Sequence, residues 1–147
     1  MPLPAELARV LTEEKIDFVK RCDLKAEVLE PGRVRLLMPL AGNQNHIGTL
    51  YAGALFTLAE IPGGALFLTS FDVQRFYPLI KDMHLRFRRP ASSDIHVEAR
   101  LTAEEIARIQ NEAEQAGKSD YRLELQLIDA AGEVVAESSA LYQLRKH

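Results

Sequence analysis

The segment from Ile47 to Leu68 constrains the fold more than any other, because nearly every residue in it is apolar or small. Its only charged residue is Glu60. A helix that is apolar on every side must be covered on every side. We therefore expect a long, buried central helix from about Thr49 to Leu68, with a kink or a break at Pro62, which has no backbone N–H.

The same segment is close to the length of about 20 residues that a membrane-spanning helix needs. A carboxylate at the centre of a bilayer, however, costs roughly 3 kcal/mol or more on insertion scales. Glu60 would lie there, beside Pro62 and the pair Gly63–Gly64, and no cationic residues flank the segment closely. A helix buried inside a soluble fold is the better interpretation, and we expect no membrane partner.

Alternation of apolar and polar residues with a period of two predicts half-buried strands in much of the remaining chain. Met83, Leu85 and Phe87, for example, alternate with polar residues. The expected strands cover residues 24–30, 33–39, 82–89, 94–101, 121–127 and 133–144.

Two further helices are expected outside the central segment. Residues 4–20 read as one amphipathic helix, whose apolar stripe contains Leu7, Val10, Leu11 and Phe18. A shorter helix over residues 102–117 opens with the capping box Thr102-Ala-Glu-Glu105 and ends at Gly117.

The order of these elements predicts an α+β fold in which one antiparallel sheet curls around the central helix. A partner subunit would cover the exposed flank of that helix. No repeat or linker interrupts the 147 residues, so we expect a single domain over residues 1–147.

Composition excludes some partners and favours a compartment. The net charge of −3 gives no basic field, so nucleic acid is not expected as the main partner. The single cysteine, Cys22, cannot form an internal disulfide, and the N-terminus lacks a basic start followed by an apolar run, so a cytoplasmic location is expected. His84 and His96 have no acidic or cysteine partner at metal-binding spacing, and no metal is predicted.

The stretch NHIGTLYAGALFTLAE, residues 45–60, resembles the signature of the hotdog-fold acyl-CoA thioesterases of the phenylacetate-pathway type. The later stretch FRRPASSDIHVEARL is similar to the strand-turn-strand of that family. The resemblance implies a hotdog domain over nearly the whole chain and hydrolysis of a thioester. It implies that Glu60 is the catalytic carboxylate, as nucleophile or general base, that Asn45 holds the attacking water or the thioester, and that the backbone N–H near Ala52 polarises the carbonyl.

Hydrolysis of a thioester needs a carboxylate, a donor for the developing oxyanion and room for an acyl chain. The N–H groups of Ala52 or Gly53 at a helix start could supply the donor. Ala52 and Glu60 are eight residues apart, which is roughly 12 Å along a helix at 1.5 Å per residue, so both cannot contact one thioester from the same chain. Antiparallel helices in a symmetric dimer could bring them together, so we expect a homodimer or homotetramer with a shared site.

Several residues are candidates for binding the substrate, an acyl-CoA or an acyl-carrier thioester. Apolar side chains near the helix start, namely Leu50, Leu55 and Phe56, could line an acyl slot. No cofactor is expected other than coenzyme A as part of the substrate, whose phosphates suit arginine. The candidates for substrate binding are His46, Gly48, Tyr51, Arg86, Arg88 and Arg89.

Three alternatives remain open from the sequence. Glu60 could be structural and paired with Arg75, Arg86 or a helix N-terminus. The chain could be a non-catalytic acyl-CoA-binding or sensing domain, because Tyr51 stands where the family often has His and Gly64 supplies no hydroxyl to the carboxylate. It could also be a hydratase or dehydratase that uses His46 and Glu60, although the proline-glycine helix entry of those dehydratases is missing.

Overall fold

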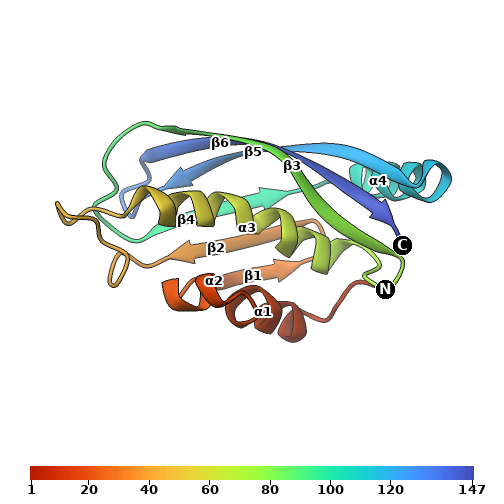
Figure 1. Ribbon diagram of the computed structural model, residues 1–147, viewed down its shortest axis with the longest axis horizontal. Helices are drawn as coiled ribbons and strands as arrows, with labels where there is room; N and C mark the ends of the chain where they lie inside the picture. The colour runs from red at the N-terminus through yellow and green to blue at the C-terminus, as the bar shows by residue number, and fades with distance from the viewer.

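A computed structural model describes the whole chain, Met1–His147 (Figure 1). One six-stranded antiparallel sheet wraps around the central helix α3 (Ala52–Ser70), in the strand order β1-β2-β4-β5-β6-β3. The expected α+β hotdog fold is confirmed. The strands are β1 (Lys25–Glu30), β2 (Arg33–Met38), β3 (Phe76–Phe87), β4 (Ile95–Arg100), β5 (Lys118–Ile128) and β6 (Val134–Lys146).

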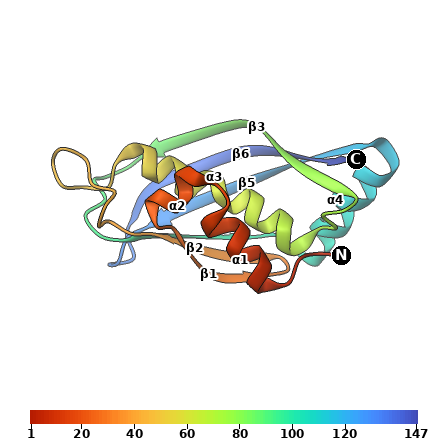
Figure 2. The same ribbon diagram turned by 60° about the horizontal axis from the view of Figure 1, so that its bottom comes forward.

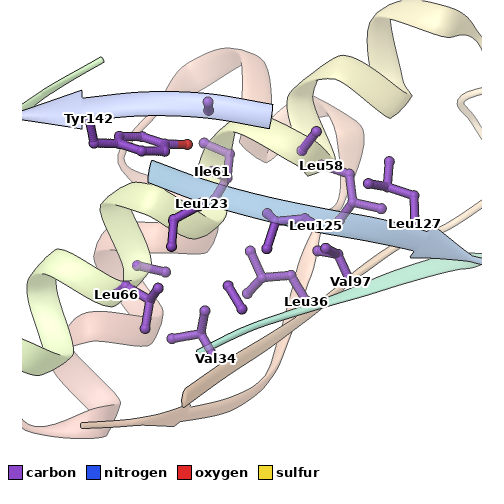
Figure 3. Close-up of a cluster of buried hydrophobic side chains, with 14 of the residues drawn as sticks. Val34, Leu36, Leu58, Ile61, Leu66, Val97, Leu123, Leu125, Leu127 and Tyr142 are labelled. Atoms are coloured by element: carbon purple, nitrogen blue, oxygen red, sulfur yellow. The ribbon is translucent and has the colours of Figure 1, made fainter. Parts of the chain in front are cut away.

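The hydrophobic core lies between α3 and the concave face of the sheet (Figure 3). Leu58 and Leu66 of α3 are fully buried there. The strand residues that face them alternate along β2, β4 and β5, and include Val34, Leu36, Val97, Leu123, Leu125 and Leu127. By length and composition α3 could cross a membrane, but about 67% of its most apolar window is buried inside the fold, as in a core helix.

Helix α3 differs from its prediction at its start and at Pro62. It begins at Ala52, because the N–H groups of Leu50 and Tyr51 donate to carbonyls outside the helix, at Ala91 (2.8 Å) and Asn43 (2.9 Å). A kink or a break was expected at Pro62; the helix continues through this residue, so there is no break. Pro62 is buried within the helix although it has no N–H to donate.

The N-terminal segment forms two helices, so the prediction of one helix over 4–20 was wrong. Helix α1 (Ala5–Glu14) lies against α3 (Figure 2). Helix α2 (Asp17–Cys22) follows after a break at Ile16, whose backbone is extended. The break shifts the helical phase. The buried side chains are therefore Ala8, Thr12, Val19 and Cys22, whereas Leu7 and Phe18 of the predicted stripe are exposed.

The strand predictions are confirmed in number and order, but β3 begins six residues earlier than expected. The segment around Pro78 does not alternate, and proline removes a donor from a sheet. Pro78 is tolerated because β3 is an edge strand that pairs only with β6. Helix α4 (Ala103–Ala116) has the expected capping box, with the Glu105 N–H donating to Thr102 Oγ1 at 3.0 Å.

Replacing either of two neighbouring glycines of α3 with alanine should have opposite effects on stability. A Cβ atom added at Gly63 would lie 2.1 Å from Cε1 of the Tyr142 ring, whereas one added at Gly64 would meet no atom within 4 Å. We expect Gly63→Ala to lower the free energy of unfolding by about 1–3 kcal/mol, because the added methyl group would overpack the core against the Tyr142 ring. Gly64→Ala, the matched control, should raise it by up to about 1 kcal/mol through helix propensity. Urea unfolding of both variants measures this difference, and equal effects would contradict the packing.

Candidate active site

Glu60 is a half-buried carboxylate without a partner. No hydrogen bond or ion pair reaches its side chain, and Arg75 instead pairs with Glu114. The structure therefore does not support the alternative in which Glu60 is fixed by Arg75 or Arg86. Burial raises the pKa of Glu60 above its usual value, with no nearby cation to lower it.

The Glu60 side chain lines a cavity of about 320 Å³ beside the free edge of the sheet. The other lining residues come from α3, β3 and β6, and are Gly64, Pro78, Leu79, Ile80 and Tyr142. Leu79 and Ile80 are 39% and 41% exposed, which is high for large apolar side chains in a strand. The cavity therefore lies where an unpaired strand leaves apolar surface uncovered.

Tyr142 of β6 holds the backbone next to this carboxylate. Its hydroxyl donates a hydrogen bond of 3.1 Å to the Glu60 carbonyl oxygen, and its ring lies beside Ile61 (Figure 3). Burial, with a smaller effect of the Glu60 charge, raises the pKa of Tyr142 well above its usual range, so the hydroxyl stays protonated. The sequence reasoning missed Tyr142, because 82 residues separate the pair and only the folded sheet joins them.

The start of α3 has free hydrogen-bond donors. No side chain caps this end, and the N–H groups of Ala52 and Gly53 have no acceptor. Ala52 lines a second cavity, of about 310 Å³, together with Asn45, Arg88 and Arg89. Uncapped N–H groups at a helix start attract a developing negative charge. This end of the helix can therefore stabilise an oxyanion.

Asn45 organises the loop before the helix. Its Oδ1 accepts hydrogen bonds of 3.0 Å from the N–H groups of Ile47 and Thr49, and its Nδ2 donates to Thr49 Oγ1 at 2.7 Å. Gly48 adopts a positive φ of 86° in the same turn. The amide of Asn45 is thus largely engaged within its own loop, and it shapes the wall of the cavity at the helix start.

The other candidate residues are dispersed. Arg88 and Arg89 form exposed ion pairs with Glu137 and Glu133, at 2.9 and 3.3 Å. Tyr51 lines a different cavity, with Phe18 and Cys22 of α2, loop residues 42–44 and Ala54. The candidates that line none of the main cavities are His46, Gly48, Gly53 and Arg86.

Within one chain, the structure gathers Asn45, Ala52, Arg88 and Arg89 in one cavity and leaves Glu60 in another. The two cavities lie at different points along α3. No group of three or more His, Cys, Asp or Glu side chains is placed to hold a metal ion.

The fold and this arrangement define a hotdog protein of the thioesterase-like class. The family described as a domain of unknown function, DUF4442, matches residues 5–142, and the chain belongs to that family.

Solved structures agree with this assignment. The chain is 72% identical to PA5026 from Pseudomonas aeruginosa, described as a protein of unknown function and probable thioesterase, with 100% of this chain and 99% of that one covered and a TM-score of 0.96. A protein of unknown function from Chlorobaculum tepidum is 16% identical with a TM-score of 0.82, over 97% and 94% of the two chains. A variant of the thioesterase PA1618 from Pseudomonas aeruginosa is 15% identical with a TM-score of 0.76, over 100% and 97%. The last two share the fold.

Proposed function

We propose that this protein hydrolyses the thioester of an acyl-CoA or acyl-carrier substrate, with Glu60 as the catalytic carboxylate. The observation that carries the proposal is a half-buried, unpaired carboxylate in a cavity that opens at a free sheet edge. The uncapped start of the same helix supports it, because it supplies an oxyanion donor. The 72% identity to a probable thioesterase agrees with this assignment.

The chemistry requires Glu60 in its ionised form. Glu60 attacks the thioester carbonyl directly, or removes a proton from a water molecule that attacks it. The carbonyl oxygen becomes an oxyanion, which accepts hydrogen bonds from the N–H groups of Ala52 and Gly53. When the intermediate collapses, the carbon–sulfur bond breaks and the thiolate leaves. If water is the nucleophile, the thiolate takes up the proton that Glu60 removed from the water. If Glu60 is the nucleophile, the acyl group remains on it as an anhydride, which water then hydrolyses to release the acid and restore the carboxylate, and the thiolate takes up the proton of that water. The net reaction consumes one water and gives a free acid and coenzyme A or carrier thiol.

A second subunit would bring these groups together. β3 is 12 residues long and its outer edge is unpaired, which favours pairing with a second copy of the strand. A symmetric antiparallel pair centred on β3 would place Phe87 of each copy opposite Phe76 of the other. Because β3 and α3 run in opposite directions (Figure 1), the helix start of one subunit would then approach the Glu60 cavity of the other.

The arginines after β3 would bind the phosphates of coenzyme A. Arg88 and Arg89 line the cavity at the helix start, and their ion pairs are exposed. Exposed ion pairs contribute about 1 kcal/mol or less, so a phosphate can displace their carboxylates. Arg86 forms no ion pair and is exposed on β3, so it is free to contribute to the same binding.

Release of free thiol from a panel of acyl-CoAs tests this function. We expect hydrolysis well above the uncatalysed rate for at least one acyl chain. Thermal stabilisation by acyl-CoA without thiol release would instead identify a binding or sensing domain. Loss of enoyl-CoA absorbance without thiol release would identify a hydratase.

A further inference from the structure

A third cavity, of about 250 Å³, lies between α1, α3 and β3. Figure 2 shows α1 lying against α3 on this side of the molecule. No charged side chain lines the cavity, and its only polar side chain is that of Thr12. The apolar lining residues include Leu11, Ile16, Ile61, Ala65, Phe67 and Leu68.

This cavity adjoins the one that contains Glu60. Gly64 and Pro78 line both of them, so the two spaces meet at these residues. Gly64 lies one turn after Glu60 on α3, and Leu68 lies one turn further, so these positions share one face of the helix. That face leads from the carboxylate into the apolar cavity over roughly 12 Å, at 1.5 Å per residue.

Gly64 keeps the junction open. A Cβ atom at this position would meet nothing within 4 Å, so no packing contact requires a glycine here. Glycine in the middle of a helix is destabilising relative to alanine. The glycine at the junction therefore brings no benefit to the packing of this chain.

We infer that the apolar cavity binds an aliphatic acyl chain and that Gly64 sets the length of chain admitted past Glu60. The inference rests on the proposed function, in which the thioester carbonyl lies at Glu60. It replaces the acyl slot expected near the helix start, because Leu50 and Leu55 line the cavity that holds two arginines, and Phe56 is exposed. A charged or strongly polar acyl group would lose its hydration in the apolar cavity without a partner, so it is excluded.

The test is a chain-length profile of kcat/KM from acetyl-CoA to dodecanoyl-CoA. Each methylene buried in the cavity should raise kcat/KM by about fourfold until the cavity is full. Gly64→Leu should lower the ratio of kcat/KM for octanoyl-CoA to that for butyryl-CoA at least tenfold, because its side chain fills the junction. Gly64→Ala should change this ratio much less. An unchanged ratio in a folded Gly64→Leu variant would overturn the inference.

A second pair of variants tests the other end of the cavity. Ile16 lines it and is 49% exposed, whereas the isomeric Leu7 is 47% exposed and lines no main cavity. Ile16→Phe should shift the profile toward shorter chains, because the larger ring occupies the cavity. Leu7→Phe, the matched control, should have the same chain-length profile as the wild-type protein. Identical profiles for the two variants would contradict the assignment of the cavity.

Binding without turnover separates this inference from the proposed function. Thermal stabilisation by free coenzyme A, butyryl-CoA and octanoyl-CoA is compared in wild-type protein and in Gly64→Leu. Stabilisation that increases with chain length only when residue 64 is glycine supports the acyl cavity, even if no thiol is released. Hydrolysis with a chain-length profile that ignores residue 64 would leave the proposed function intact and overturn the cavity assignment.

Discussion

Replacing Glu60 with glutamine should reduce kcat/KM for thioester hydrolysis by a factor of roughly 10² to 10⁴, the range expected for loss of a catalytic base. The amide has nearly the same shape as the carboxylate, so the cavity beside Leu79 and Ile80 should persist. It can neither accept the proton of an attacking water nor act as a nucleophile. Thiol release by purified protein, followed alongside circular dichroism to verify folding, measures the loss. Retention of wild-type activity would remove Glu60 from the mechanism.

Stability provides an independent control for the same variant. The folded protein raises the pKa of Glu60 above the ordinary value of 4.5, so its protonated form is the one favoured by folding. The stabilisation that comes from this shift is fully present below the pKa of Glu60 in the unfolded chain. It is lost as the pH rises through the pKa of Glu60 in the folded protein. Glu60→Gln should therefore be more stable than wild type at pH 8, with a difference that narrows as the pH falls toward 4.5. Urea unfolding at several pH values measures this trend.

The pH dependence of catalysis follows from the same shift. Glu60 must be ionised to act, so kcat/KM should fall on the acid side as Glu60 takes up a proton. Because burial raises its pKa, this fall should begin at a higher pH than for an exposed glutamate. A profile that stays flat down to the ordinary value of 4.5 would contradict the buried setting of the carboxylate.

Mixing two inactive variants should restore activity if the site is shared between subunits. Ala52→Pro removes the N–H of the first residue of α3, where proline is well tolerated, and Tyr51 before it already has an extended backbone. Loss of one oxyanion donor should lower kcat by about 10² to 10³. In an equal mixture with Glu60→Gln, half of the symmetric dimers are mixed and each contains one intact site. Activity should therefore recover to about a quarter of the wild-type value.

The controls for this experiment use the same two positions. Ala52→Ser keeps the N–H and should remain active, which would show that the effect of proline comes from the missing donor. The mixture must be compared with each variant alone after the same exchange of subunits. If subunits exchange, as labelled chains can verify, and activity does not recover, then Glu60 and Ala52 do not act across an interface.

Local patterns in the sequence predicted much of the fold. The apolar segment identified the central helix, and alternation located the six strands in their order, because each pattern reflects which face is buried. The break at Ile16 was not predicted, since the apolar residues on both sides could be placed on one helical stripe and nothing in that pattern marks the extended backbone of Ile16. The start of β3 was missed because Pro78 is compatible with a strand only at a sheet edge.

The sequence predicted only those parts of the candidate site whose residues lie close together along the chain. Glu60 and Ala52 lie on one recognisable helix, and their separation along it was enough to predict two distinct positions. The sequence did not place Tyr142 or Pro78 around the carboxylate, because both lie on strands that are far from Glu60 along the chain. It also did not reveal the open space beside Gly64, since that space exists only in the packed structure.

In the proposed dimer, the unpaired edge of β3 would link catalysis to solubility. A subunit that has not met its partner presents a long strand with open hydrogen-bonding groups and the apolar side chains of Leu79 and Ile80, a combination that promotes aggregation. Assembly would cover that strand in the same step that completes the reactive centre. Substitutions along this edge should therefore lower the yield of soluble protein and the turnover rate together.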